Sequence, residues 1–258
     1  MEKQVLWARE ARSGAVPLNQ RKNEFGQLIG DEVSGWNGAA LPSRKPIDGR
    51  YCVVEPLDVS RHARDLFEAF SDDREGALWT YMATGPFATI EDFIAWMEPA
   101  CKTNDPLFHA LIDLSTGRAA GMASYMRIKQ MAGVIEVGSI SLSPRMQRTR
   151  SATEAMFLMM RRVFDELGFR RYEWKCDSLN EASRRAAERL GFSFEGVFRQ
   201  AIIYKGRNRD TAWYSIIDSE WSVIKKAFET WLDPGNFDEG GCQKGSLRDM
   251  ITLQRERI

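Results

Sequence analysis

Two strand-like segments alternate with two helical ones between residues 134 and 190, and this order limits the fold more than any other feature of the sequence. The first strand is rich in β-branched residues and stops before Pro144. The helix after it carries apolar side chains at helical spacing, and Gly168 stands where a left-handed residue commonly ends a helix. The four segments are Val134–Leu142, 152–167, Tyr172–Asp177 and about 180–190.

Further strands are predicted on both sides of this unit. The first of them ends near Pro56, and the two helices that follow it are expected to be capped by Asp58 and Thr89. Because strands cluster before and after the alternating unit, the sequence predicts a single α+β, or mixed α/β, domain. The additional segments are strands at 51–57, 107–114, 119–129, 194–204 and 213–217, a helix at 220–231 and an amphipathic stretch at 247–258.

Composition divides the chain into three parts. Residues 1–49 are polar, with glycine and proline at short intervals, which is typical of an irregular arm. Residues 50–218 hold the predicted strands and form the main domain. Residues 219–258 are predicted to be a C-terminal helix and tail that pack on the domain or extend from it. Because the tail could support a dimer, we expect a monomer or a homodimer.

Charge and cysteine content exclude several classes of partner. The 36 basic residues balance 36 acidic ones, so no overall field would attract nucleic acid or an anionic membrane. Four scattered cysteines and two histidines lack the spacing of a zinc site or a disulfide framework. No apolar run approaches about 18 residues, and charges interrupt the start of the chain. We therefore expect a cytoplasmic protein without a metal, and without a nucleic-acid or membrane partner.

The stretch from Val134 to Glu154 is a candidate anion site. Its strand crosses a short polar loop into a helix, and a helix start presents unpartnered N–H groups and a partial positive charge. Arg145, Arg148 and Arg150 add positive charge around this loop. Backbone donors and arginines together could hold a pyrophosphate and a ribose phosphate. Loop arginines that are only solvated are an equally common alternative.

Two polar residues follow the strand at Tyr172–Asp177. Asn180 stands where its side chain can cap the next helix, or can instead bond to an extended, amide-bearing ligand lying between strands. Ser183 lies on the first turn of that helix, where the backbone can satisfy its hydroxyl. The residue types alone favour the capping interpretation of Asn180.

Four stretches together resemble the GNAT acetyltransferases, and among these the RimJ/RimL-like branch, which includes ribosomal-protein N-terminal acetyltransferases. The likeness covers about residues 50–218 and is most specific from Glu136 to Ile217. It implies the GNAT fold, a splayed mixed sheet of about seven strands with helices on both faces, and direct transfer of an acetyl group from acetyl-CoA to a primary amine. The stretches are the strand at 134–142, SPRMQRTRSATEA, NEASRRAAERLGF and FEGVFRQAIIYKGRNRDTAWYSI.

In that family two neighbouring parallel strands part, and the pantetheine of acetyl-CoA fills the opening between them. Carried over, the opening lies between Glu136–Leu142 and Tyr172–Asp177, and the pyrophosphate rests on the loop before the helix at 152–167. The cofactor-binding residues that the resemblance implies are Ser141, Leu142, Gln147, Arg148, Thr149, Arg150, Ser151, Ala152, Asn180 and Ser183.

The loop departs from the family pattern at two positions. Where the family usually has glycine, this chain has Arg148 and Arg150. Glycine lets phosphates approach the backbone closely, but the first turn of a helix needs no positive φ. We therefore expect the N–H groups to stay available and the arginine side chains to take a larger share of the binding.

Acetyl transfer needs a base for the amine, donors for the oxyanion and a donor for the departing thiolate. Glu136 is the candidate base, because apolar neighbours on the parting strand would desolvate it. It could act through a water molecule, or could be only an edge residue or an ion-pair partner. Many relatives have a tyrosine donor where this chain has Ala187, so the resemblance assigns the thiolate to Ser183. A backbone N–H within 140–142 would meet the oxyanion.

The acceptor side is the part of the site that the sequence defines least. Aromatic residues around the second helix and in the last hairpin are candidates to line it, although aromatics at such places often fill the core. Asp210 is also a second candidate base, although turn carboxylates are usually structural. The candidate acceptor-binding residues are Trp79, Tyr81, Phe87, Tyr204 and Asp210.

Three functions remain open at this stage. The first is acetylation of the α-amine of a protein or peptide. The second is acetylation of a small-molecule amine, such as an amino acid, an amino sugar or an antibiotic. The third is binding of an acyl-CoA without catalysis, since the loop has lost its glycines and the helix its tyrosine.

Overall fold

The computed structural model of the chain describes residues 21–256 and divides into two compact units, 1–37 and 38–258. In the first unit the short strands β1 (Arg21–Lys22) and β2 (Leu28–Ile29) form an antiparallel hairpin. The side-chain oxygen of Asn23 accepts two backbone N–H groups of its turn. The arm predicted as irregular therefore contains this hairpin, and its residues 1–20 lie outside the described part.

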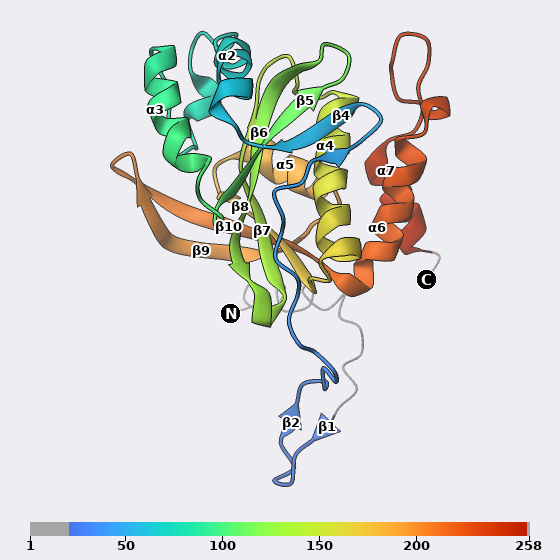
Figure 1. The fold of residues 1–258 in the computed structure, drawn as a ribbon. Coiled ribbons are helices and arrows are strands. Elements are labelled where there is room, and N and C mark those ends of the chain that lie inside the picture. Colours follow the sequence, from blue (N-terminus) through green and yellow to red (C-terminus); the bar gives the residue numbers. More distant parts are fainter. Residues whose placement is uncertain (1–20, 257–258) are drawn as a thin grey trace, which may run out of the picture. The chain divides into compact units, whose positions relative to one another are not determined.

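Eight strands of the described chain form one sheet in the second unit, in the order β3-β4-β5-β6-β7-β8-β10-β9 (Figure 1). Neighbouring strands are antiparallel except β7 and β8, which run parallel. The seven predicted strands are present, and the sequence analysis missed only the two-residue β3 of this sheet. The strands are β3 (Ile47–Asp48), β4 (Cys52–Pro56), β5 (Leu107–Asp113), β6 (Arg118–Lys129), β7 (Val134–Leu142), β8 (Arg171–Asp177), β9 (Ser193–Tyr204) and β10 (Arg207–Ile217).

Two helices cover one face of the sheet over β5 and β6. These helices, α2 (Val59–Phe70) and α3 (Ile90–Ala100), bury a cluster of apolar side chains that includes the fully enclosed Phe93. As predicted, the side chains of Asp58 and Thr89 cap them by accepting backbone N–H groups of the first turn. Short 3₁₀ turns occur at η1 (Ala77–Trp79), η2 (Gln130–Ala132) and η4 (Pro234–Asn236).

The opposite face carries α4 (Arg150–Arg161) and α5 (Glu181–Arg189). The buried hydroxyl of Tyr125 in β6 donates to a carbonyl of α4 at 2.9 Å, which fixes the helix on this face. α4 begins two residues before the predicted start, because Thr149 caps it. It then continues into a π-helical turn, η3 (Arg162–Glu166). The predicted sheet with helices on both faces is confirmed.

The C-terminal helices lie beside α4 (Figure 1). In α6 (Asp218–Trp231), the ring of Phe228 stacks on Phe157 of α4 at 5.2 Å. The amphipathic stretch near the end of the chain forms α7 (Leu247–Arg255), which contacts α6 and buries Ile251. This part of the chain therefore extends the core on the α4 side of the sheet.

Glu154 ties α4 to the start of β4. The side chain is 5 % exposed, and its two oxygens accept the backbone N–H groups of Arg50, Tyr51 and Cys52 at 2.9, 2.6 and 2.9 Å. A Cβ added at Gly49 would lie 2.5 Å from the carboxylate, so only glycine leaves room for this contact. One buried carboxylate thus satisfies three N–H groups that have no strand partner.

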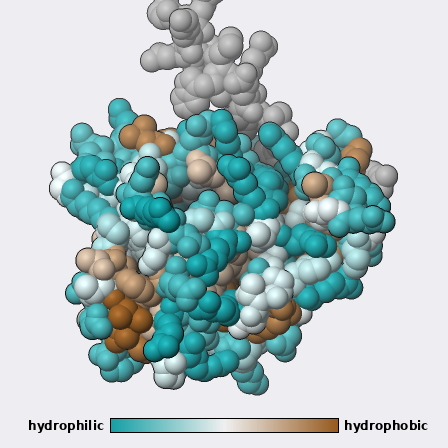
Figure 2. Space-filling view, turned by 90° about the horizontal axis from the view of Figure 1, so that it is seen from above, coloured by the Kyte–Doolittle hydropathy of each residue, from teal (hydrophilic) through white to brown (hydrophobic). Residues whose placement is uncertain are grey.

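Hydrophilic residues cover most of the face seen in Figure 2, and hydrophobic ones gather there in separate patches. Among residues 21–256, no helix is long and apolar enough to cross a membrane. The same residues hold no group of three or more His, Cys, Asp and Glu side chains suited to a metal ion.

Candidate active site

The parallel strands β7 and β8 part after a short paired segment. They are in register from Val134 opposite Arg171 to Val137 opposite Trp174, and beyond this β7 pairs with β6 alone. A bulge in β7, where Ser139 has a φ of 50°, bends the strand at this point. The predicted opening is therefore present, but it begins two residues later on β7 and three residues later on β8 than expected.

Three backbone N–H groups at the start of α4 have no protein partner. Within residues 21–256, those of Arg148, Arg150 and Ser151 donate to no acceptor, and neither does that of Arg145 earlier in the loop. The N–H groups of Gln147 and Ala152 are used inside the loop, at 3.0 and 3.1 Å. Three free donors at a helix start are suited to a phosphate group. The set of free donors is thus smaller than the Gln147–Ala152 set that was predicted to bind a phosphate.

The backbone at Arg148 corrects one expectation. Its φ is 61°, in the left-handed region, whereas the sequence analysis expected a loop without positive φ. The chain turns sharply before the helix begins, and Arg148 precedes the helix rather than belonging to its first turn. Glycine, which the family has at this position, adopts this φ without steric cost.

The strain at Arg148 can be tested with two substitutions that both remove the guanidinium. Arg148→Gly should have a free energy of unfolding about 1 kcal/mol higher than Arg148→Ala, because only alanine keeps a Cβ in the left-handed region. Urea denaturation of the two variants measures this difference. An alanine variant as stable as the glycine variant would contradict the positive φ.

Two of the three loop arginines are already engaged. Arg145 pairs with Glu68 of α2 and with Asp72, two residues after that helix. The guanidinium of Arg150 lies between the rings of Tyr51 and Phe237, 4.9 and 4.6 Å from their centroids. Arg148 is exposed and has no ion pair within the described chain. Of the three arginines, Arg148 is therefore the one whose charge is uncompensated within residues 21–256.

The other predicted loop side chains shape the turn. The side-chain amide of Gln147 donates to the carbonyl of Leu142 at 2.9 Å. Thr149 is the helix cap, and the hydroxyl of Ser151 donates to a backbone carbonyl at 3.1 Å. Ser141 is fully buried, and its hydroxyl has no partner in the described part of the chain. The side chains hold the loop, and its free N–H groups are left for a ligand.

Asn180 caps α5, as the residue types favoured. Its side-chain oxygen accepts the N–H of Ser183 at 3.0 Å. The hydroxyl of Ser183 accepts the indole N–H of Trp174 at 3.0 Å, so its own proton can be donated. Burial raises the pKa of the neighbouring Cys176 thiol, and a hydrogen bond with Ser183 opposes that rise. The Ser183 hydroxyl is thus held in place by Trp174, and its proton faces the Cys176 sulfur.

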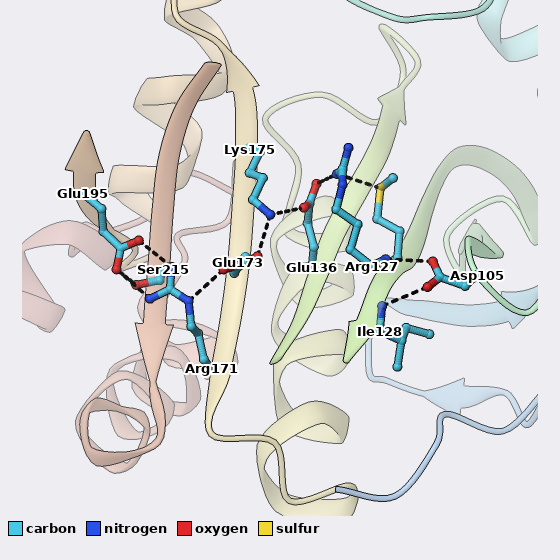
Figure 3. A network of polar contacts seen from close by, with 10 residues as sticks. Asp105, Arg127, Ile128, Glu136, Arg171, Glu173, Lys175, Glu195 and Ser215 are labelled. Atoms are coloured by element: carbon cyan, nitrogen blue, oxygen red, sulfur yellow. Dashed lines mark hydrogen bonds and ion pairs between the residues drawn. The ribbon is translucent and has the colours of Figure 1, made fainter. Parts of the chain in front are cut away.

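Glu136 is 2 % exposed and belongs to a row of alternating charges (Figure 3). Its Oε1 accepts a hydrogen bond from Arg127 at 2.6 Å. Its Oε2 lies 2.9 Å from Lys175 Nζ, in an ion pair whose angles do not suit a hydrogen bond. Lys175 also contacts Glu173 at 2.6 Å. The row consists of Arg127, Glu136, Lys175, Glu173, Arg171 and Glu195.

The surroundings of Glu136 differ from the apolar ones that were expected. Two cations compensate the carboxylate, and the sequence analysis named neither Arg127 nor Lys175. The signal for Lys175 was present in β8, where Glu173, Lys175 and Asp177 alternate with aromatic and apolar residues. No such signal exists for Arg127. Its side chain is directed by a bulge in β6, in which Arg127 itself has a φ of 49°.

Trp79 is packed in the core between α2 and the connection to α3. It is 5 % exposed and packs edge-on against Phe70 and Phe87, with centroids 5.3 and 5.4 Å apart. Trp79 and Phe87 also line a cavity of ≈ 290 Å³ between α2 and the connection to α3. Trp79 therefore packs in the core and also borders this cavity, and its role in acceptor binding stays a prediction.

The two predicted tyrosines lie where β8 ends. Tyr81 donates to the carbonyl of Leu179 at 3.2 Å, and Tyr204 donates to Asp177 at 2.8 Å. Lys205, at the tip of the β9–β10 hairpin, binds carbonyls of the α2–α3 connection at 2.7 and 2.9 Å. The hairpin and this connection thus meet at the end of β8, next to the opening.

Asp210 supports the hairpin. Its Oδ1 accepts the N–H of Gln200, a bulged residue with a φ of 51°, at 2.7 Å, and the side-chain amide of Asn208 at 3.0 Å. These two hydrogen bonds lower the pKa of Asp210. A carboxylate with a lowered pKa is a weak base, so the structural alternative fits Asp210 better than the catalytic one.

Comparisons with known proteins agree with this geometry. The acetyltransferase (GNAT) domain family matches residues 53–193. A GCN5-related N-acetyltransferase from Brucella melitensis is 48% identical, with a TM-score of 0.84 over 86% of this chain and 100% of that one. A probable acetyltransferase (GNAT family) from Chromobacterium violaceum ATCC 12472 is 38% identical, with a TM-score of 0.71 over 76% of this chain and 98% of that one.

A curated relative carries a more specific name. The "Putative ribosomal N-acetyltransferase YdaF" of Bacillus subtilis (strain 168) is 27% identical over 177 residues, which is 67% of this chain and 93% of that protein. The family match, the parted strands and the helix-start cradle lead to one conclusion: the chain is an acetyltransferase that belongs to the GNAT family.

Proposed function

We propose that this enzyme transfers the acetyl group of acetyl-CoA to the α-amine of a peptide or protein. The observation that carries the proposal is the opening between β7 and β8, which has free N–H donors at one end and the carboxylate of Glu136 beside its start. The name of the Bacillus relative, a ribosomal N-acetyltransferase, supports a protein acceptor.

The cofactor side of the proposal uses groups already in place. The pyrophosphate binds the N–H groups of Arg148, Arg150 and Ser151, and the guanidinium of Arg148 adds a mobile charge. The pantetheine lies along the unpaired part of β7. Ser183 donates its proton toward the departing thiolate, since its oxygen is held by Trp174.

The acceptor side needs a group that takes a proton from the ammonium form of the substrate. Glu136 is the buried carboxylate nearest the start of the opening on β7. Both of its oxygens contact cations, so we propose that an ordered water molecule carries the proton to it. Arg127 and Lys175 hold the carboxylate in a single position.

Acetyl-CoA binding and thiol release test this proposal together. At a hundredfold excess over its dissociation constant, acetyl-CoA should raise the apparent stability by roughly 3 kcal/mol, which a thermal-shift titration measures. Release of free CoA should then require a peptide amine, and amino acids, amino sugars and aminoglycosides should serve poorly. Release with a small amine alone would favour the alternative acceptor, and binding without any release would indicate a non-catalytic protein.

A further inference from the structure

Three buried polar atoms on one face of β10 lack a partner. They are Nε of Arg209, Oγ1 of Thr211 and Nε1 of Trp213, none of which contacts an acceptor within residues 21–256. The three residues alternate along the strand, so they share one face. Trp213 stands opposite Lys175 in β8, which places this face on the Glu136 side of the sheet. Buried polar groups in native proteins are normally satisfied by protein or ordered water, so these atoms are available to water or to a ligand.

The donor of Trp213 is held in a fixed position. The Trp213 ring stacks on Phe198 with centroids 4.3 Å apart. The Nζ of Lys175, from the neighbouring strand β8, lies 3.8 Å from the centroid of the Trp213 ring. Thr211 is 3 % exposed and stands opposite Asp177, whose oxygens already accept from Tyr204 and a backbone N–H. Neither donor needs to be reoriented when a ligand arrives.

Arg209 differs from the other cations of the hairpin. Lys205 and Arg207 use their charges to bind carbonyls of the α2–α3 connection. Arg209 lies half-buried, with no carboxylate at ion-pair distance in the described part of the chain. A half-buried guanidinium without an anion is suited to bind one.

The chemistry of the three groups defines what they recognise. Indole and guanidinium groups only donate hydrogen bonds, whereas carbonyl and carboxylate oxygens only accept them. Residues two apart on a strand are about 7 Å apart, which matches the spacing of groups on one side of an extended peptide. The face thus offers donors for a peptide carbonyl near Trp213 and for an anion near Arg209.

We propose that Arg209, Thr211 and Trp213 form an acceptor-binding row that selects a peptide with an acidic side chain at its second or third residue. The first carbonyls of the peptide bind Trp213 and Thr211, its carboxylate binds Arg209, and its α-amine points toward Glu136. The inference rests on the proposed function for the position of the amine, but the binding of the acidic group can be measured without turnover.

Matched tetrapeptide amides test the row. Ser-Glu-Glu-Ala amide and Ser-Gln-Gln-Ala amide differ in charge but hardly in shape. Isothermal titration and kcat/KM should both favour the acidic peptide by at least about tenfold, and Arg209→Gln should abolish this preference. Arg199→Gln, which removes an exposed arginine of the same hairpin, should retain it. Equal affinity of the wild-type protein for both peptides would overturn the inference, whether or not acetylation occurs. Acidic-peptide binding without acetylation would refute only the proposed function.

Two further variants separate binding from folding. Trp213→Phe keeps the stacked ring and loses the N–H, and Thr211→Val keeps the shape and loses the hydroxyl. Because Oγ1 of Thr211 has no partner in the free protein, Thr211→Val should melt at or above the wild-type temperature, whereas Trp213→Phe should melt slightly below it because the smaller ring packs less. Both variants should bind the acidic peptide at least several-fold more weakly. A lowered melting temperature with unchanged peptide affinity would show that the atoms serve the fold.

Discussion

Replacing Glu136 with glutamine should lower kcat by about 10²-fold or more, the usual contribution of a general base. The substitution keeps the side chain's shape and its hydrogen bond from Arg127 but removes the negative charge that would accept the proton. The dissociation constant of acetyl-CoA should stay within about twofold of wild type, because the proposed phosphate-binding N–H groups lie at the start of α4 and not near Glu136 in β7. Steady-state kinetics with a peptide acceptor and a separate acetyl-CoA titration measure the two quantities.

The control is Glu173→Gln, which removes a carboxylate from the same charge row. Glu173 contacts Lys175, the lysine that also contacts Glu136, at 2.6 Å. It lies on β8, directly opposite Glu136 in the paired part of the two strands. If the charge row mattered only for packing, the two variants would lose activity alike. A wild-type kcat for Glu136→Gln would remove the residue from the mechanism and leave the acceptor amine to be deprotonated by solvent.

Replacing Glu154 with glutamine should lower the free energy of unfolding by about 3 kcal/mol. The carboxylate accepts three backbone N–H groups while buried, and hydrogen bonds to charged groups are worth more than neutral ones. A glutamine amide would turn its own donors toward at least one of those N–H groups. The expected decrease in melting temperature is roughly 6 to 12 °C for a chain of this size, measurable by calorimetry.

Glu229→Gln is the matched control for this stability effect. Glu229 is exposed on α6, so the same change of charge should shift the unfolding free energy by no more than about 0.5 kcal/mol. An effect at Glu154 as small as that at Glu229 would mean that the start of β4 is held by other contacts. The N–H groups of Arg50 and Tyr51 would then have water as an adequate partner.

Several parts of the site were predictable because they depend on local sequence. The change from a polar loop to apolar residues at helical spacing placed the start of α4, where Thr149 caps the helix, to within two residues. Asn180 caps α5, as its residue type favoured. Such features involve residues three or four apart, and their geometry is set by the backbone of one segment.

Other parts depend on which segments become neighbours. The charges around Glu136 come from β6 and β8, and nothing in the β7 sequence indicates them. The positive φ of Arg148 was unexpected because arginine rarely adopts it, and the surrounding turn imposes it. Trp79 was predicted to line the acceptor site, and the structure packs it against Phe70 of α2 in the buried cluster.

The sequence alone determined the order of elements, the helix caps and the family, since each of these is encoded in short stretches with their own periodicity or motif. Only the tertiary structure decided where β7 leaves β8, which cations hold Glu136 and which donors of β10 lack a partner. The reason is physical: strand pairing and buried charge are properties of residues brought together from distant segments. Their energies depend on distances and burial that no single segment specifies.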